Sequence, residues 1–140
     1  MTTPTDHVLL DVTDGIATIT LNRPERRNAM SPEMVERVEI LRRRAAMVAG
    51  MATLDGWRLK GCGAYFAWAE HPFPIASNDL ARRLVAEAGV LLLPGTMFMP
   101  EGDPIEGRHV RIAFANADAD GIARLIERLA AFGDAARGRA

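Results

Sequence analysis

Cysteine, histidine and lysine are scarce in this chain of 140 residues, and each scarcity excludes a kind of chemistry. Cys62 is the only cysteine, so no internal disulfide can form, and we expect a reducing, cytoplasmic setting with an inert, buried thiol. His7, His71 and His109 are widely spaced and have no cysteine or carboxylate at ligand intervals, which argues against a metal site. Lys60 is the only lysine, so any chemistry that needs a lysine nucleophile depends on it.

No stretch of the sequence is apolar enough for a membrane segment, and the N-terminus lacks the basic start and apolar run of a signal peptide. Apolar residues make up 49% of the chain and charged residues 25%, as in an ordinary globular domain, and the net charge is −1. Residues 21–44 hold seven arginines but also four glutamates, with no aromatic side chain between them for base stacking. We therefore expect neither a nucleic acid nor a membrane as a partner.

The N-terminal third of the sequence predicts a β-hairpin followed by a long helix. Residues 8–12 and 16–21 are rich in β-branched and apolar side chains, and Thr13-Asp14-Gly15 between them suits a tight turn. Ser31-Pro32 is typical of a helix start. Apolar residues then recur at steps of three and four and predict one buried helix face, formed by Met34, Val38, Leu41, Ala45, Val48 and Ala52.

The rest of the sequence predicts three strands and two further helices. The strands are expected at 64–72, 90–93 and 109–116. One helix is expected from Ser77 to Gly89, and a last helix begins after Asp118 and leaves a frayed tail at 135–140. The apolar stripe of the last helix consists of Ile122, Leu125, Ile126 and Leu129. This order indicates an α+β fold of two layers, with helices on one face of a small mixed sheet and an added N-terminal hairpin.

Arg111 is the strongest candidate for a binding residue. Side chains alternate along a strand, so Val110, Ile112 and Phe114 are expected in the core, while Arg111 shares the other face with alanines. A guanidinium with this much room suits a planar partner that accepts two hydrogen bonds, such as a carboxylate. The pattern alone leaves an alternative open, in which Arg111 is an edge arginine that forms a salt bridge or extends into water.

Three stretches between residues 61 and 116 carry a family resemblance. They are GCGAYFAWAEHPFP, LARRLVAEAGVLLLPGTMF and GRHVRIAFAN, in this order. Together they resemble the C-terminal small domain of the class I/II, fold-type-I aminotransferases, over residues ~35–133. The resemblance implies pyridoxal phosphate as cofactor, seated mostly on a large domain, amino acids and 2-oxo acids as substrates, and a homodimer. In that family the arginine of the VRIAFA strand holds the substrate's α-carboxylate, and this position is Arg111.

The beginning of the chain resembles a different family. The stretch HVLLDVTDGIATITLNRPERRNAMSPEM, residues 7–34, is similar to the opening hairpin of the crotonase family, the enoyl-CoA hydratases and isomerases. There the NRPERRNA segment begins the CoA-binding edge, so the resemblance implies that Arg26 and Arg27 lie near the nucleotide part of CoA. The alternative is that both are simply exposed. We therefore predict a crotonase-like fragment at residues 1–34 and an aminotransferase small domain at residues 35–140.

Neither resemblance brings a catalytic centre. Pyridoxal-phosphate chemistry needs a lysine, an acid for the pyridinium nitrogen and a phosphate cradle, and Lys60 does not stand where the family places its lysine. We expect no catalytic residue and no metal or cofactor bound by the chain alone, with Arg111 kept for substrate binding. The expected partner is a separate large domain or a second copy of the chain. Two alternatives stay open, a self-associating interaction module and a residual acyl-CoA-binding protein of crotonase type.

Overall fold

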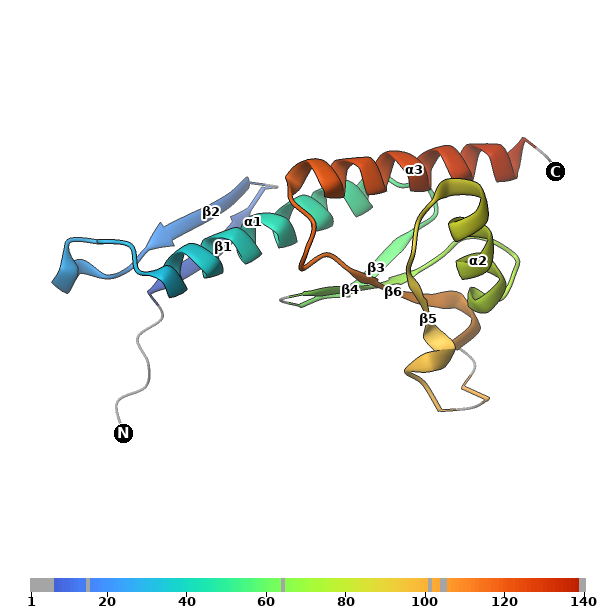
Figure 1. Cartoon of the computed structure of the whole chain (residues 1–140), viewed down its shortest axis with the longest axis horizontal. Helices are drawn as coiled ribbons and strands as arrows, with labels where there is room; N and C mark the ends of the chain where they lie inside the picture. The colour runs from blue at the N-terminus through green and yellow to red at the C-terminus, as the bar shows by residue number, and fades with distance from the viewer. Residues whose placement is uncertain (1–6, 15, 64, 101, 104–105, 139–140) are drawn as a thin grey trace.

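One long helix connects two small sheets (Figure 1). The computed structural model describes residues 7–14, 16–63, 65–100, 102–103 and 106–138. The strands are β1 (Val8–Thr13), β2 (Ile16–Leu21), β3 (Arg58–Cys62), β4 (Phe66–Glu70), β5 (Leu93–Pro94) and β6 (His109–Ala113). The helices are α1 (Pro32–Ala52), α2 (Ser77–Arg83) and α3 (Ala119–Arg137), with short helical segments η1 (Pro24–Arg26), η2 (Leu84–Ala88), η3 (Gly95–Met97) and η4 (Glu106–Arg108). These elements confirm the predicted α+β class.

The predicted hairpin forms a sheet of its own. The strands β1 and β2 are antiparallel, and Thr13 pairs with Ile16, so the turn is one residue shorter than predicted. Asp14 has φ +50°, a value that suits the tight turns of two-residue hairpins. The other predicted turn residue, Gly15, lies outside the described residues.

The hairpin packs against the first half of α1. Val8 of β1 is 1% exposed and Met34 of α1 is 2% exposed, so these two side chains form the centre of the contact. Arg37 adds a hydrogen bond, because its Nε donates to the carbonyl oxygen of Val8 at 3.2 Å. The predicted cap is present, with the Ser31 hydroxyl accepting from the N–H of Met34.

The second sheet has the strand order β3-β4-β6-β5, and every neighbouring pair in it is antiparallel rather than mixed. It has one strand more than predicted, β3. Gly61 interrupts the apolar pattern of residues 58–62. In the structure the register between β3 and β4 shifts between Leu59 and Gly61, so the glycine lies at an irregularity of the strand pairing. A bulge of this kind disturbs the alternation from which a strand is recognised in a sequence.

The strand predicted at 90–93 is shorter in the structure. Only Leu93 and Pro94 pair with β6. The residues before them alternate in burial, since Val90 and Leu92 are buried in the core while Leu91 is 81% exposed. The apolar run VLLL is therefore mostly a partly buried connecting segment, and only its last residue belongs to a strand.

The helices α1 and α3 lie across one face of the four-stranded sheet, and α2 lies beside β5 (Figure 1). The core fills the space between these helices and the sheet. It includes the predicted inward residues of β6, Val110, Ile112 and Phe114, and from the stripe of α3 the buried Ile122 and Leu129. The opposite face of β4 and β6 carries exposed or half-buried side chains together with the buried His109.

The second half of α1 uses a different face from the predicted one. Met47 and Met51 are buried there, whereas Val48 is 37% exposed. At about 100° per residue, Met47 lies roughly 220° around the helix from Met34, which faces the hairpin. The single predicted stripe is therefore wrong beyond Leu41, because α1 meets the hairpin and the second sheet on nearly opposite sides.

The remaining helix ends follow the chemistry of the sequence with two exceptions. Ser77, expected as the cap of the second helix, is instead the first residue of α2, whose N-cap is Ala76 and which no side chain caps. Gly89 has φ +62° and ends the segment that α2 and η2 form, as predicted. Asp118 caps α3 by accepting from the N–H of Gly121 at 2.7 Å. The helix then continues to Arg137, past the predicted end, because Phe132 near its end is buried in the core.

We call residues 8–42 the N-terminal arm and residues 46–137 the sheet unit. The arm extends away from the sheet unit along the axis of α1 (Figure 1). No helix in the described part of the chain is long and apolar enough to cross a membrane.

Candidate functional site

An arginine lies at the centre of the open face of the sheet unit. Arg111 is in β6, opposite Trp68 of β4 and Leu93 of β5. Its neighbours Val110 and Ile112 are 0% and 2% exposed on the helix side, so Arg111 points to the other side, as predicted. Because β6 has a paired strand on each side, the alternative of an edge arginine is wrong.

Two phenylalanine rings enclose the guanidinium group of Arg111. Its Cζ atom is 4.3 Å from the ring centre of Phe66 and 4.0 Å from that of Phe98. Both distances lie well inside the roughly 6 Å range of the cation–π interaction. Phe66 belongs to β4, whereas Phe98 follows η3, so the fold brings together three segments that are far apart in the sequence.

Arg111 has no acidic partner among the described residues. Its Nε atom is buried and has no hydrogen-bond acceptor. Neither of its terminal nitrogens is both buried and without a hydrogen-bond partner. The Nε atoms of Arg23 and Arg43 are also buried without an acceptor, but these two arginines donate through a terminal nitrogen, Arg23 to the carbonyl of Ala29 and Arg43 to that of Ala115. A charged group that is partly removed from water without a counter-ion is costly, so Arg111 favours an anion that arrives from outside.

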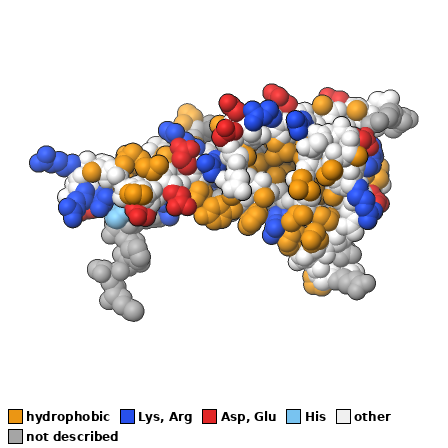
Figure 2. Space-filling model, viewed as in Figure 1, with side chains coloured by type: hydrophobic (Ala, Val, Ile, Leu, Met, Phe, Trp, Pro, Cys, Tyr) orange, Lys and Arg blue, Asp and Glu red, His pale blue; other side chains and the backbone are white. Residues whose placement is uncertain are grey.

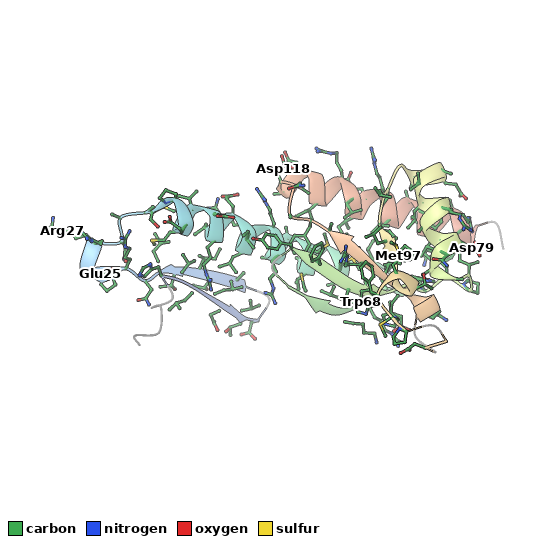
Figure 3. The ribbon with its side chains drawn as sticks, turned by 60° about the horizontal axis from the view of Figure 1, so that its bottom comes forward. Glu25, Arg27, Trp68, Asp79, Met97 and Asp118 are labelled. Carbon is green, nitrogen blue, oxygen red and sulfur yellow. The ribbon has the colours of Figure 1, made fainter. Side chains whose placement is uncertain are left out.

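More aromatic and apolar side chains surround this arginine. The ring of Trp68 meets that of Phe98 edge-on at 6.0 Å and stacks on His109 at 5.5 Å. Met97 is 64% exposed and lies on the same side of the molecule as Trp68 (Figure 3). Hydrophobic side chains also gather on the face of the sheet unit that Figure 2 shows.

A second charged group on the open face is neutralised within the fold. The Nζ of Lys60 lies 2.9 Å from Oε2 of Glu70, which pairs across the strands with Arg58 on one side and His109 on the other. The hydrogen bond from Lys60 holds the pKa of Glu70 below its ordinary value. The only lysine is therefore a partner of Glu70 at the β3 edge of the sheet.

The structure does not bring the other candidate residues to Arg111. Arg26 and Arg27 are exposed at η1 in the N-terminal arm, and Figure 3 shows Arg27 at the opposite end of the molecule from Trp68. Cys62 is half-buried, and burial raises the pKa of its thiol, in keeping with an inert cysteine. Within the described residues no three histidine, cysteine or acidic side chains gather as metal ligands would.

The aromatic enclosure is the part of the site that the sequence interpretation missed. Alternation along the predicted strand identified Arg111, whereas the prolines and glycines of residues 96–107 indicate only a loop. Phe66 could have been found, because it alternates with Trp68 on the strand beside Arg111. Phe98 had no such signal, since its distance from Arg111 depends on how the chain after β5 folds back over the sheet.

A family model matches most of the chain. Residues 11–129 match the model described as aminotransferase class I and II. No curated protein matches the chain. The match begins inside β1, so it does not mark the predicted boundary between residues 34 and 35. The crotonase likeness of residues 7–34 stays a prediction.

Several solved structures share the fold. One is a multiple substrate aminotransferase from Thermococcus profundus, with 25% identity and a TM-score of 0.63 over 78% of this chain and 27% of that chain. Another is the α-aminoadipate aminotransferase of Thermus thermophilus, with 28% identity and a TM-score of 0.58 over 70% of this chain and 26% of that chain. A kynurenine aminotransferase of Pyrococcus horikoshii has 30% identity and a TM-score of 0.55 over 70% and 25%. The chain thus spans about a quarter of the length of these enzymes.

Proposed function

Since the chain belongs to the family of class I and II aminotransferases, we propose that it acts as a small domain of that type. In this proposal Arg111 binds the α-carboxylate of an amino acid or a 2-oxo acid. The reaction to which it contributes is the transfer of an amino group between two such acids. The residues of this chain do not suffice for this transfer, which also needs the groups of a large domain.

The observation that carries the proposal is the unpaired guanidinium of Arg111. A carboxylate that approaches its terminal nitrogens can accept two parallel hydrogen bonds, the geometry in which arginine is strongest. The open face leaves room for such a ligand, because the long helices α1 and α3 lie on the other side of the sheet, and on this side the short segment η3 contacts β6 and ends at Phe98. Hydrogen bonds to charged groups contribute about 1.5–3 kcal/mol, so a single acid would bind weakly without further contacts.

The described residues do not fit pyridoxal phosphate, the cofactor that the family implies. When bound, this group supplies the electron sink for transamination, and it needs a lysine amine and an acid beside its pyridinium nitrogen. Lys60 and Glu70 are engaged with each other at 2.9 Å instead of facing Arg111 as a free amine and a free acid. The contribution of this chain is therefore to bind and orient the substrate's carboxylate.

We also propose the division of the chain into a crotonase-like hairpin at 1–34 and a small domain at 35–140. Two observations support this division. The strands β1 and β2 form a sheet of their own, and the helix against which they pack is α1. The family match from residue 11 onward does not support it.

Carboxylate binding is tested directly with the purified chain. Propanoate is titrated while the Nε–H signal of Arg111 is followed by nitrogen-15 NMR, with Arg111→Met to assign the signal and serve as the control. The signal should shift on titration, and no saturable change should remain in the variant. A signal of Arg111 that stays unmoved at ~100 mM propanoate contradicts the proposal.

The cofactor part of the proposal has its own test. The chain is incubated with pyridoxal phosphate, reduced with borohydride and digested for mass spectrometry. We expect no specific adduct on Lys60 beyond what a lysine in an unrelated control protein shows. Stoichiometric modification of Lys60, or turnover of an amino donor by the chain alone, refutes the view that it lacks a catalytic centre.

A further inference from the structure

The rings that enclose Arg111 keep much of their own surface exposed. Phe66 is 44% exposed and Phe98 is 40% exposed, although each covers one side of the guanidinium group. Met97, next to Phe98 in the chain, is 64% exposed. Large apolar side chains that stay in water around one charged donor are typical of a binding surface rather than of a structural ion pair.

The enclosure also decides how an acid can approach. Because Cζ of Arg111 lies over two aromatic rings, little of the flat guanidinium surface is left for a ligand to stack on, and a carboxylate is expected to meet the group at its terminal nitrogens. The rest of the ligand then lies beside the exposed parts of Phe66, Phe98 and Trp68. The rings thereby hold the guanidinium in one orientation and offer an apolar surface to whatever is attached to the carboxylate.

The strand positions next to this surface offer little to a second carboxylate. The nearest positions on this face hold Trp68, which lies across the strands from Arg111, and His109, which lies two residues before it on β6, and the rings of these two residues stack on each other. Beyond them lie Arg58 and Lys60, but both flank Glu70, and Lys60 is bonded to it. A second negative group on the ligand would therefore meet aromatic rings or the carboxylate of Glu70.

We infer that the open face selects monocarboxylates that carry an aromatic or large apolar group, and disfavours dicarboxylates. This inference rests on the proposed function of Arg111 and adds the class of acid to it. Phe66 and Phe98 are the positioning residues, since they orient the guanidinium and contact the apolar part of the ligand. The substrate class implied is an amino acid or 2-oxo acid with an aromatic or bulky apolar side chain.

The test compares three acids on the intact chain by nitrogen-15 NMR. These are 3-phenylpropanoate, propanoate and glutarate, each titrated while the Arg111 Nε–H signal is followed. We expect 3-phenylpropanoate to bind at least about fivefold more tightly than either of the other two, since an apolar group gains contact with the rings. Phe98→Leu should remove most of this preference, because it should weaken the binding of 3-phenylpropanoate more than that of propanoate. Val85→Ala, at another exposed apolar residue, should change neither.

A second readout does not depend on ligand affinity. A proton held between two aromatic rings has a ring-current shift, so the Nε–H signal of Arg111 should move toward its random-coil position in Phe98→Leu and in Phe66→Leu. An unmoved signal in both variants, in a protein whose core signals are unchanged, means that the rings do not hold the guanidinium and overturns the inference.

The outcomes separate this inference from the proposed function. If all three acids bind equally and Arg111→Met abolishes binding of each, Arg111 is a carboxylate site without selectivity, and the inference alone is lost. Tighter binding of glutarate likewise overturns the inference and leaves the proposed function in place. If no acid moves the Arg111 signal at all, the proposed function fails and the inference fails with it.

Discussion

The N-terminal arm and the sheet unit are built from similar residues but bury them to very different extents. In the arm, Val8 and Met34 are the side chains that reach full burial, and Val12 and Ile16 of the hairpin are 58% and 69% exposed. In the sheet unit, a continuous core extends from Met47 of α1 to the last turns of α3. A two-stranded hairpin by itself is marginally stable in water, so the folded state of the arm depends on the packing of the hairpin against one side of α1. Apolar content alone therefore does not show where a chain is stable.

The same comparison supports the proposed binding site. The arm has the greater density of arginines, yet those with described contacts bond to neighbouring backbone or to glutamates, as Arg37 does to Val8 and Arg42 to Glu39. The sheet unit holds an arginine that is fixed by two rings and has no acidic partner among the described residues. A binding group is distinguished by its fixed position and unused hydrogen bonds, and not by the local number of charges.

Truncation of one core phenylalanine should have the largest effect. Phe114 is 1% exposed in the sheet unit, and Phe114→Ala should lower the free energy of unfolding by about 3–5 kcal/mol, measured by urea denaturation with circular dichroism. The matched change in the arm is Val12→Ala at a 58% exposed position, for which we expect a change within about 0.5 kcal/mol. Similar losses in both variants would show that the two regions are not as different as their burial indicates.

Gly50 tests the close contact between α1 and α3, where the arm's helix enters the sheet unit. A Cβ atom at this position would lie 2.5 Å from Cγ1 of Ile126. Helix propensity favours Gly50→Ala by about 1 kcal/mol, whereas overpacking costs about 1–3 kcal/mol, so we expect a net loss of up to about 2 kcal/mol. In urea denaturation, Ile126→Ala in the same chain should recover part of that loss. A more stable Gly50→Ala protein would mean that the two helices do not approach so closely.

Acid should weaken the sheet unit through a buried histidine. His71 is 0% exposed beside Trp57 and Phe73, and burial lowers its pKa, while the hydrogen bond to the Gly107 carbonyl opposes this shift. The unfolded chain then binds the proton more readily, so stability is full above the ordinary histidine pKa of about 6.5 and falls as the pH decreases below it. The slope reaches at most about 1.4 kcal/mol per pH unit.

The measurement is the melting temperature between about pH 7.5 and pH 5 for the natural chain and for His71→Gln, which cannot take up the proton. The decrease toward pH 5 should be smaller in the variant. Equal slopes in the two proteins would show that protonation of His71 does not cause the decrease.

The smallest effect is expected in the arm and should remain local. Val8→Ala truncates the buried side chain of the hairpin and should lower the free energy of local opening of β1 and β2 by about 1–2 kcal/mol. Hydrogen exchange should become faster at the amides of these strands and stay unchanged in β4 and β6. Leu9→Ala, on the other side of β1 at 42% exposure, is the control. Faster exchange throughout the sheet unit would instead mean that the two regions unfold together.

Sequence patterns predicted the elements whose chemistry is local. The hairpin, the Ser31 cap, the start of the last helix after Asp118, the end of a helix at Gly89 and the inward face of β6 all follow from a few neighbouring residues. The errors occurred where a distant partner decides. The strand β3 contains a bulge, and α1 turns different sides to the hairpin and to the core, so neither has a single regular pattern.

The sequence by itself determined that Arg111 lies on a strand with its side chain away from the core, because alternation along a strand is a property of the backbone. It also determined that one lysine at most is available for any chemistry. Only the tertiary structure decided that this lysine is bonded to Glu70 and that Phe66 and Phe98 lie on the two sides of Arg111. The reason is physical, since a strand sets the direction of its own side chains, whereas the groups they meet come from segments brought near by the packing of the whole sheet.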